Sequence, residues 1–508
     1  MQLCTTNIPN IKPAPLLVMP GKNAAGLPEK VLQFGTGVLL RGLPDFIINN
    51  ANNNNIFNGR IVVVKSTTTT GTANDFSEQD CLYTLCVRGI SEGEKITQNH
   101  LVSSISRVLS AATEWDEILK CAASPDMQVI ISNTTEVGLT LTDDDIQAIP
   151  PQSFPGKLLA FLCYRYKHFN GDAEKGIAII PTELLPDNGK LLLSIVVALA
   201  HQNNVGIDCI NWIKNANYFC SSLVDRIVPG KLKPAEQQQV ENEVGYTDNL
   251  MIVAEPYYLW AIETDSENVK AMLSFALNDT GVIIAPSINK FRELKLRLLN
   301  GAHTFSCGLA FLAGFTTVKE AMDNPRFYAY IHQLMYKEII PSICSTEISE
   351  QDAVTFAGKV LDRFMNNFIE HKWLSITMQY SLKMNTRNAT VIQQYESIFK
   401  EVPASMALGM AAHILFMKGQ ESADGNYYSM INGNNYWIND SNAAVYALAW
   451  KENNHQHVVE IILGNQNIWQ TPHPFSNSFK AAVVHWLQIL MTAGASVAIV
   501  MADKNQAV

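Results

Sequence analysis

The chain has 508 residues, of which 47% are hydrophobic, and a single core stops growing well below this length, so two domains are expected. The formal net charge is −10 and the lysines and arginines are scattered along the sequence, which excludes the basic surface of a nucleic-acid-binding protein. We therefore expect a small molecule as the partner, and no nucleic acid.

The beginning of the chain and its thiols indicate a compartment. Residues 1–30 contain several prolines and lack the basic start, apolar run and small-residue cleavage site of a signal peptide, so they are interpreted as an extended leader. The nine cysteines contain no Cys-x-x-Cys pair and are too sparse for a disulfide framework. Reduced thiols of this kind are typical of a cytoplasmic protein.

Short apolar runs alternate with longer helical patterns through the first half of the chain. The runs cover residues 31–34, 61–64, 128–131 and 176–180. Alternation of this kind predicts βαβ units and a mostly parallel sheet, which is an α/β fold. The Asn-rich segments 49–58 and 432–442 are interpreted as surface turns, because Asn tolerates the left-handed backbone region.

The first of these runs leads directly into the glycine-containing segment Gly35-Thr36-Gly37-Val38. Two glycines at a strand-to-helix junction let the backbone approach a pyrophosphate, and the N–H groups of the next helix face it. Leu40 stands where a third glycine is usual, so an ordinary turn remains the alternative. Arg41 is a candidate cation for the phosphate, with an unspecific surface arginine as its alternative.

The second run ends at Lys65, followed by Ser66 and Thr67. In a dinucleotide-binding domain an acidic side chain at this place binds the adenosine ribose. Lys65 instead suits a 2′-phosphate, which would mean NADP; the alternative is a solvated lysine beside an NAD ribose held by the neighbouring hydroxyls.

From about residue 286 the pattern becomes helical, because apolar residues recur at spacings of three and four. The apolar stretch 481–502 raises the question of a membrane span, but His485, Gln488, Thr492 and Gly494 interrupt it. We predict a core helix that ends near Gly494, and no membrane partner.

The segment 291–304 holds three candidate catalytic residues. At about 100° per residue, Lys295, Asn300 and His303 lie within an arc of roughly 140° of one helix. Ketone reduction needs a proton donor for the oxygen and donors that stabilise the alkoxide, and a desolvated lysine can move a proton near neutral pH. The alternative is that the lysine and asparagine are solvated and the histidine is structural.

The motif Lys-x-Arg-x-Leu-Asn-Gly-Ala-His at 295–303 resembles the active-site signature of the polyol-specific long-chain dehydrogenases, the mannitol dehydrogenase family. The resemblance implies a Rossmann-like NAD-binding domain over 1–285, a mainly α-helical substrate and catalytic domain over 286–508, and metal-independent hydride transfer. By this resemblance Lys295 is the acid/base, and Asn300 and His303 hold the substrate oxygen. A family resemblance is also carried by Gly35-x-Gly37-x-x-x-Arg41, Gln79-Asp80-x-Leu82-Tyr83-Thr84 and Val224-Asp225-Arg226-Ile227.

The sequence resembles the tagaturonate reductase branch of the family more specifically. The segments that carry this likeness are Ser132-Asn133-Thr134-Thr135-Glu136-x-Gly138, residues 217–228, and Leu299-Asn300-Gly301-Ala302-His303-Thr304. The resemblance implies the substrate pair D-tagaturonate and D-altronate, a step of galacturonate breakdown, and places Asn133, Thr134 and Asp225 among the cofactor-binding residues. Such reductases with a basic residue at the position of Lys65 are taken to use NAD, so NAD is expected rather than NADP.

One position departs from the mannitol enzymes. They carry an oxyanion-binding Asn in a stretch that corresponds to residues 181–189, whereas Leu184 stands at that place here. The sugar-acid branch resembles this chain at the same position, which favours a uronate over a plain polyol and leaves the second oxyanion donor open.

A sugar acid needs cations for its carboxylate, because a buried charge without a partner is strongly disfavoured. His371, Lys383 and Arg387 lie in a helical stretch that resembles the substrate-binding part of the family's second domain, and the alternative is that all three are solvated. Other functions left open are a fructuronate/mannonate or polyol dehydrogenase and a nucleotide-binding regulatory protein without turnover. A zinc dehydrogenase is disfavoured, because Cys307 and His303 find no further metal ligands nearby.

Overall fold

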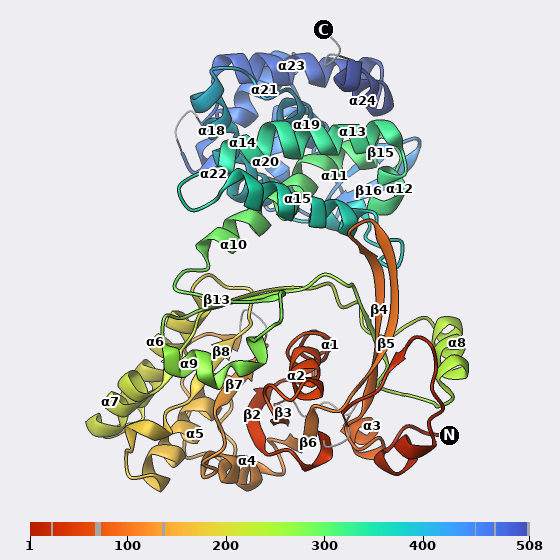
Figure 1. Ribbon diagram of the computed structural model, residues 1–508. Coiled ribbons are helices and arrows are strands. Elements are labelled where there is room, and N and C mark those ends of the chain that lie inside the picture. The colour runs from red at the N-terminus through yellow and green to blue at the C-terminus, as the bar shows by residue number, and fades with distance from the viewer. Residues whose placement is uncertain (22–23, 67–72, 135–137, 453, 472–473, 505–508) are drawn as a thin grey trace. The chain divides into compact units, whose positions relative to one another are not determined.

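The computed structural model describes residues 1–21, 24–66, 73–134, 138–452, 454–471 and 474–504 (Figure 1). The chain divides into two compact units. The first unit comprises Met1–Gly89 and Lys95–Ile288, and the second comprises Ile90–Glu94 and Asn289–Val508.

The first unit is built on a six-stranded sheet with the order β6-β3-β2-β7-β8-β9. Its strands are β2 (Glu29–Phe34), β3 (Arg60–Lys65), β6 (Ile105–Ser110), β7 (Val129–Ser132), β8 (Ala178–Pro181) and β9 (Tyr218–Phe219). The recorded pairings are all parallel. Numbered along the chain, this order is 3-2-1-4-5-6, the doubly wound arrangement that binds dinucleotides. The predicted parallel α/β domain is confirmed, and each of the four predicted runs forms one of these strands.

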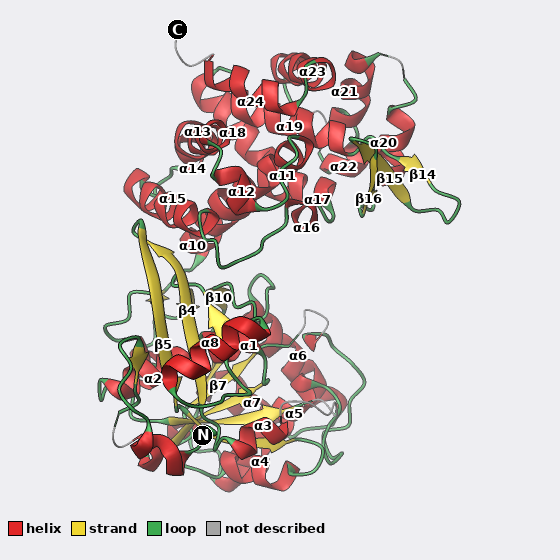
Figure 2. Cartoon of the chain, turned by 90° about the vertical axis from the view of Figure 1, so that its right-hand side faces the viewer, coloured by secondary structure: helices red, strands yellow, loops and turns green. Residues whose placement is uncertain are grey.

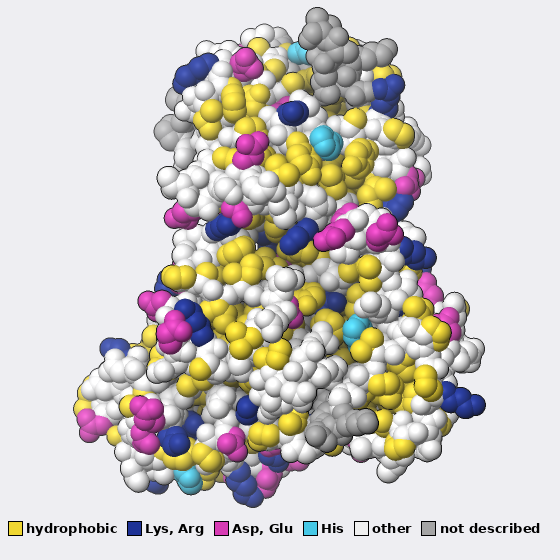
Figure 3. Space-filling view, in the orientation of Figure 1, with side chains coloured by type: hydrophobic (Ala, Val, Ile, Leu, Met, Phe, Trp, Pro, Cys, Tyr) yellow, Lys and Arg dark blue, Asp and Glu magenta, His cyan; other side chains and the backbone are white. Residues whose placement is uncertain are grey.

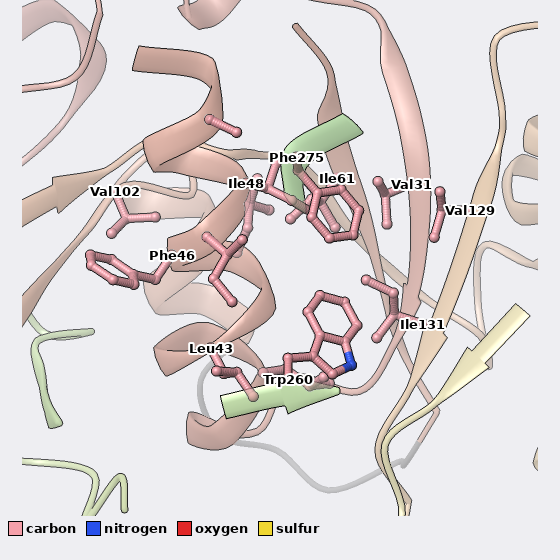
Figure 4. Close-up of a cluster of buried hydrophobic side chains, with 14 of the residues drawn as sticks. Val31, Leu43, Phe46, Ile48, Ile61, Val102, Val129, Ile131, Trp260 and Phe275 are labelled. Atoms are coloured by element: carbon pink, nitrogen blue, oxygen red, sulfur yellow. The ribbon is translucent and has the colours of Figure 1, made fainter. Parts of the chain in front are cut away.

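The central strands are apolar at successive positions because both faces of the sheet are covered. Along β7, Val129 and Ile131 join one buried cluster and Ile130 joins the other. The second cluster is closed by α4 (Trp115–Ala122), α5 (Phe154–His168), α6 (Asn188–Gln202) and α7 (Ile207–Ala216). The first is covered by α1 (Val38–Gly42), α2 (Pro44–Asn53) and a small sheet. From that sheet Trp260 stacks on Phe275 at 5.4 Å between ring centroids (Figure 4).

The first unit also contains elements that the sequence did not predict. A four-stranded sheet has the order β1-β5-β4-β11, and a three-stranded sheet has the order β10-β12-β13. The strands are β1 (Leu17–Val18), β4 (Tyr83–Ser91), β5 (Glu94–Val102), β10 (Ser222–Asp225), β11 (Ile252–Ala254), β12 (Leu259–Glu263) and β13 (Val282–Ala285). The remaining helices are α3 (Ala73–Glu78), α8 (Pro234–Val244) and α9 (Glu267–Met272).

The interpretation of residues 49–58 as surface turns is wrong for their first half, which forms the end of α2. Asn49 is buried and accepts a hydrogen bond from the N–H of Ser103, and Asn52 both donates to and accepts from the backbone of Gly59. Because these amides satisfy buried backbone groups, they stay inside the helix despite their preference for turns. Residues 432–442 include strand β16 as well as a turn at Asn432 and Gly433, both with positive φ.

The second unit is mainly helical, as predicted, with a small antiparallel sheet of β14 (Gln420–Glu421), β15 (Tyr427–Ile431) and β16 (Asn434–Ile438) (Figure 2). Its α-helices are α10 (Asn289–Leu294), α11 (Ala302–Leu312), α12 (Val318–Met322), α13 (Pro325–Gln333), α14 (Ile340–Ile343), α15 (Glu350–Phe364), α16 (Trp373–Ile376), α17 (Tyr380–Met384), α18 (Thr390–Phe399), α19 (Ala404–Phe416), α20 (Ala443–Ala449), α21 (His455–Leu463), α22 (Gln466–Trp469), α23 (Asn477–Thr492) and α24 (Ala495–Lys504). Helices α11 and α19 pack closely at the centre. A Cβ on Gly409 of α19 would lie only 2.7 Å from the carbonyl oxygen of Phe305 of α11.

Three π-helical segments interrupt the α-helical geometry of this unit. They are η6 (Lys295–Gly301), η7 (Leu334–Ile339) and η8 (Asn385–Ala389), and each continues α-helices at both ends. The π-helix bonds residue i to i+5 and is rare, mostly as single turns that are frequently at functional sites. Segments η6 and η8 contact each other.

The predicted helix end near Gly494 is confirmed, because α23 and α24 are separated there and Gly494 has a φ of 88°. Among the described residues, none of the helices combines the length and apolar character needed to span a bilayer. On the face shown in Figure 3, Lys and Arg are interspersed with Asp and Glu, in agreement with the scattered charges of the sequence.

Candidate active site

The glycine-containing loop connects β2 to α1 at the carboxyl edge of the six-stranded sheet. Gly35 has a φ of +129°, and a Cβ there would lie 2.9 Å from Cδ1 of Leu40. This conformation and close packing require glycine at position 35. Gly37 precedes α1 with an ordinary φ of −63°, and among the described residues other than its chain neighbours none has an atom within 4 Å of a Cβ placed on it. The space beside Gly37 is therefore open in the free protein, next to Thr36 and Val38.

Asn133 and Thr134 follow β7, which is the neighbour of β2 in the sheet. The N–H of Asn133 donates to the carbonyl of Phe34 at 3.3 Å, so this segment lies directly beside the glycine-containing loop. The strand order reverses between β2 and β7, and ligands of such sheets bind outside the carboxyl ends of the strands at this point. The structure thus brings Gly35 and Asn133 together, as the sequence predicted. Thr135 and Glu136 lie outside the described residues.

Glu183 holds this segment in place, and the sequence analysis gave it no role. Its buried carboxylate accepts hydrogen bonds from the N–H and the hydroxyl of Thr134, at 2.8 and 3.0 Å, and from the hydroxyl of Ser132 at 3.2 Å. Burial raises the pKa of Glu183 above its ordinary value. Asn133 donates in turn to the hydroxyl of Thr182 at 3.0 Å. The position of Glu183 after an apolar strand was the only signal for it in the sequence.

Lys65 ends β3, next to β2, and its side chain is partly exposed. The hydroxyl of the following residue, Ser66, is buried and has no hydrogen-bond partner within the described residues. An unsatisfied buried hydroxyl is unusual in proteins, and its place fits a ribose hydroxyl of a dinucleotide. Thr67 lies outside the described residues.

Two predicted cofactor residues lie elsewhere in the first unit. The guanidinium of Arg41 is buried, donates to the carbonyl of Leu250 at 2.7 Å and lies over the ring of Tyr83. Arg41 therefore stabilises the interior and does not present its charge to a phosphate, contrary to the expectation for it. Asp225 is buried at the end of β10, opposite Leu259 of β12, in the small sheet.

Leu184 lies just after β8 and is 62% exposed, so it does not belong to the core. The next asparagine, Asn188, does not replace the missing amide. Its Nδ2 donates to the carbonyls of Pro181, Glu183 and Ser222, and its Oδ1 accepts from the N–H of Ser222. Asn188 is completely used by the backbone around it.

In the second unit the three candidate catalytic residues lie on one continuous helix, but this helix is not regular. Lys295 begins η6, Asn300 lies within it, and His303 follows on α11. The expectation of about 100° per residue is therefore wrong between Lys295 and Gly301, because the π turn is wider than an α turn. Lys295 and Asn300 are partly exposed, whereas His303 is buried at 8% exposure.

Aromatic rings surround His303. Its ring centroid lies 4.1 Å from that of Phe364, 5.1 Å from that of His371 and 5.8 Å from that of Trp373. Burial holds the pKa of His303 well below its ordinary value, and the nearby positive groups lower it further. Its Nδ1 has no hydrogen-bond partner within the described residues. The imidazole is therefore neutral at neutral pH.

Groups that can carry positive charge act on His303, and they include all three residues predicted to bind a carboxylate. They are His371, Arg363, Arg387 and Lys383. Lys383 donates to the carbonyl of Ile376 at 3.1 Å, and Arg387 donates to the hydroxyl of Thr304 at 3.0 Å. Burial lowers the pKa of Lys383, of Arg387 and of His371. Arg363, which begins the stretch of cations that the sequence indicates, is buried and also acts on His303.

Hydrogen bonds connect the two π-helical segments that carry these groups. Arg297 of η6 donates to the carbonyls of Thr386 and Arg387 of η8, at 3.1 and 2.6 Å. Asn388 donates back to the carbonyl of Gly301 at 3.3 Å. The arginine is itself held by Glu293 at 2.9 Å. The segment with Lys295 and Asn300 is thereby fixed against the segment with Arg387.

Metal ligands are not clustered in the part of the chain that the structure describes, where His, Cys, Asp and Glu form no group of three or more suited to an ion. Cys307, one turn from His303, is buried and donates to the carbonyl of Thr304. Burial raises the pKa of Cys307 to about 12, so the thiol stays protonated.

Sequence comparisons match almost the whole chain to known families. The mannitol dehydrogenase Rossmann domain matches residues 29–274, and the mannitol dehydrogenase C-terminal domain matches residues 287–490. An altronate oxidoreductase of Halalkalibacterium halodurans is 36% identical over 477 residues, which cover 92% of either chain. The altronate oxidoreductase of Bacillus subtilis is 36% identical over 78% of this chain and 81% of its own, and that of Escherichia coli is 34% identical over 88% and 91%.

Two solved structures share the fold over both units. A Pseudomonas fluorescens mannitol 2-dehydrogenase, in ternary complex with NAD and D-mannitol, has a TM-score of 0.68 at 23% identity and covers 99% of this chain and 100% of its own. A D-sorbitol dehydrogenase in substrate-free form has a TM-score of 0.75 at 18% identity and covers 98% and 100%. At these identities the likeness concerns the fold alone.

Proposed function

The chain belongs to the mannitol dehydrogenase family and is an oxidoreductase that acts on CH–OH groups, and we propose that it reduces D-tagaturonate to D-altronate with NADH and catalyses the reverse oxidation. The names of the relatives support this substrate pair, because altronate oxidoreductases match this chain over most of its length. The enzyme is proposed to work in the cytoplasm, in galacturonate breakdown; its nine cysteines are free thiols.

The cofactor is proposed to be NAD(H), bound at the carboxyl edge of the six-stranded sheet. The residues assigned to it are Gly35, Thr36, Gly37, Val38, Lys65, Asn133 and Thr134, and the family resemblance adds Asp225, which is buried in the small sheet. The open space beside Gly37 suits a pyrophosphate, and the hydroxyl of Ser66, which has no partner among the described residues, suits a ribose. Arg41 is left out because its guanidinium is buried against Leu250. When bound, NADH supplies the hydride, and with it both electrons, that the carbonyl carbon of the substrate receives.

The chain supplies the proton and stabilises the developing charge. The Nζ of Lys295 gives a proton to the carbonyl oxygen, so that ketone, hydride and proton together form the alcohol. The amide of Asn300 and the imidazole of His303 donate hydrogen bonds to the same oxygen while it carries negative charge. His303 is neutral and has one N–H to donate. The rings packed around the buried imidazole fix the direction of that donor. In the oxidation of altronate, Lys295 takes up the proton instead.

The cations around His303 support a sugar acid as the substrate. Lys383 and Arg387 form no hydrogen bond to a carboxylate within the described residues, and His371 lies beside the same imidazole. A substrate carboxylate would receive charge-assisted hydrogen bonds from such groups, each about 1.5–3 kcal/mol. The exposed Leu184 stands where the mannitol enzymes of the family resemblance hold an amide, which favours the sugar-acid branch.

A substrate panel tests the proposal. The oxidation of NADH and NADPH is followed with tagaturonate, fructuronate and uncharged ketoses, with the purified full-length protein. We expect the highest kcat/KM for tagaturonate with NADH. A preference for fructuronate or for an uncharged ketose would replace the substrate, and a preference for NADPH would make Lys65 a clamp for the 2′-phosphate.

A further inference from the structure

The hydroxyl of Thr304 connects two of the π-helical segments of the second unit, η6 and η8. Thr304 is 1% exposed and follows His303 on α11. Its Oγ1 donates to the carbonyl of Asn300 at 2.7 Å and accepts a hydrogen bond from Nη1 of Arg387 at 3.0 Å. One buried hydroxyl thus connects the residue proposed to bind the substrate oxygen with a cation of the carboxylate-binding group.

The guanidinium of Arg387 is held by hydrogen bonds from one of its nitrogens, Nη1. Nη1 bonds the hydroxyl of Thr304 and also lies 3.4 Å from the carbonyl oxygen of Asn300. Within the described residues, Nε and Nη2 of Arg387 have no recorded hydrogen bond, and neither atom is among the buried unsatisfied ones. These two nitrogens form the edge of a guanidinium that binds a carboxylate through two parallel hydrogen bonds.

The surroundings of Arg387 add positive charge and no bonded carboxylate. Lys383 lies one turn earlier, and within the described residues its ammonium donates only to the carbonyl of Ile376. Arg387, Lys383, Arg363 and His371 all act on His303. An arginine side chain loses rotamer entropy when it binds a ligand. A hydroxyl that fixes one end of the guanidinium before the ligand arrives reduces that cost, because the receptor is already oriented.

We propose that Thr304 is a positioning residue for charge selectivity: it fixes Arg387 so that the Nε–Nη2 edge receives the carboxylate of a sugar-acid substrate. The inference rests on the proposed function, because it assigns the anchor of that substrate. It makes Thr304 act through Arg387 and not on the reacting carbonyl. Loss of the hydroxyl is therefore expected to change KM for charged substrates and to leave kcat nearly unchanged.

Three variants test the inference. Thr304→Val keeps the shape and removes the hydroxyl, and Thr304→Ser restores the hydroxyl. Ser342→Ala is the matched control, because Ser342 is also buried and donates to the carbonyl four residues earlier, at Glu338, with no cation bonded to its hydroxyl. Steady-state kinetics are measured with tagaturonate and with an uncharged ketose, and thermal unfolding of each variant reports on the fold.

For Thr304→Val we expect KM for tagaturonate to rise about tenfold, which corresponds to about 1.4 kcal/mol, with kcat within about threefold of the wild type. KM for the uncharged ketose should stay constant, and Thr304→Ser and Ser342→Ala should behave as the wild type. Equal losses on both substrates, an unchanged KM for tagaturonate, or a Thr304→Ser variant as impaired as Thr304→Val would overturn the positioning role.

The wild type separates this inference from the proposed function. If it reduces a different keto-uronate, the substrate assignment fails and the Thr304 comparison is made with that keto-uronate. If it reduces only uncharged ketoses, both the assignment and the carboxylate anchor are wrong.

Discussion

The imidazoles of His303 and His371 meet edge to face, with their ring centroids 5.1 Å apart. Burial lowers the pKa of both, and the shared neighbour Arg363 lowers each further. Two imidazoles in such a place are neutral over the range in which most dehydrogenases work. Each then offers one N–H donor and one acceptor nitrogen, so they bind oxygen atoms without adding charge to the reacting group.

The neutral state of His303 predicts a resonance that does not titrate near the ordinary pKa of 6.5. In ¹⁵N-labelled protein, the ring nitrogens assigned by comparison with His303→Asn should keep the shifts of neutral imidazole down to pH 5.5. Since the folded-state pKa is depressed, the contribution of this group to stability is present above pH 6.5 and is lost as the pH falls toward the folded-state value. Protonation of His303 near pH 6.5 would show that it is solvated.

Replacement of Lys295 by alanine should lower kcat by about 10²- to 10⁴-fold, the usual contribution of a general acid or base. The binding of NADH should change little, because Lys295 belongs to the second unit and not to the glycine-containing loop. Lys290→Ala is the control on the same stretch of helix, since Lys290 forms an ion pair with Asp352. Retained turnover in Lys295→Ala would remove this lysine from the mechanism.

Gly37→Val is expected to weaken NADH binding by about tenfold or more, equivalent to about 1.4 kcal/mol. The free protein tolerates the side chain, because no atom of the described residues beyond its chain neighbours lies within 4 Å of a Cβ at Gly37 and its φ is ordinary. Gly206→Val is a close control: Gly206 also precedes a helix, with a φ of −57° and a ψ of 140°, and its Cβ space is also open. If both variants bind NADH as the wild type does, the pyrophosphate does not lie at this loop.

The sequence predicted those parts of the fold that repeat locally. The runs that became β2, β3, β7 and β8 are mostly apolar at successive positions because helices and a second sheet cover both faces. Strands β4 and β5 were not predicted, although they are neighbours in the chain and in the sheet; only their outer partners β1 and β11 are distant in sequence. The helical end of α2 was missed because Asn49 and Asn52 satisfy backbone groups of Ser103 and Gly59, and no local pattern records that.

The candidate site also has a part that the sequence predicted and a part that it did not. The spacing of Lys295, Asn300 and His303 is local, and it could be read without the structure. Its π-helical geometry could not, because an assumed period of 3.6 residues hides a wider turn. Glu183 acts across 49 positions, on Thr134. Such contacts depend on the tertiary fold, so only the structure connects them with the site.

Prolonged treatment with EDTA should leave activity intact. The physical reason is that the thiol nearest to His303, that of Cys307, is buried with a pKa raised to about 12, whereas a metal ligand must be a thiolate. Activity is measured after dialysis against the chelator and again after addition of zinc. Loss of turnover that zinc restores would contradict the metal-independent mechanism.

Lys383→Ala should raise KM for tagaturonate by roughly tenfold, about 1.4 kcal/mol, and affect an uncharged ketose far less. The ammonium of Lys383 donates to the carbonyl of Ile376. Burial lowers the pKa of Lys383, and the positive charge of Arg387 lowers it further. An ammonium group with a lowered pKa gains most from an incoming carboxylate, because that charge replaces the hydration it has lost. Lys372→Ala is the control, since Lys372 is exposed and lies 3.7 Å from a carboxylate oxygen of Glu370. Equal losses on charged and uncharged substrates would make Lys383 structural, and Arg387 would then remain as the anchor of the uronate.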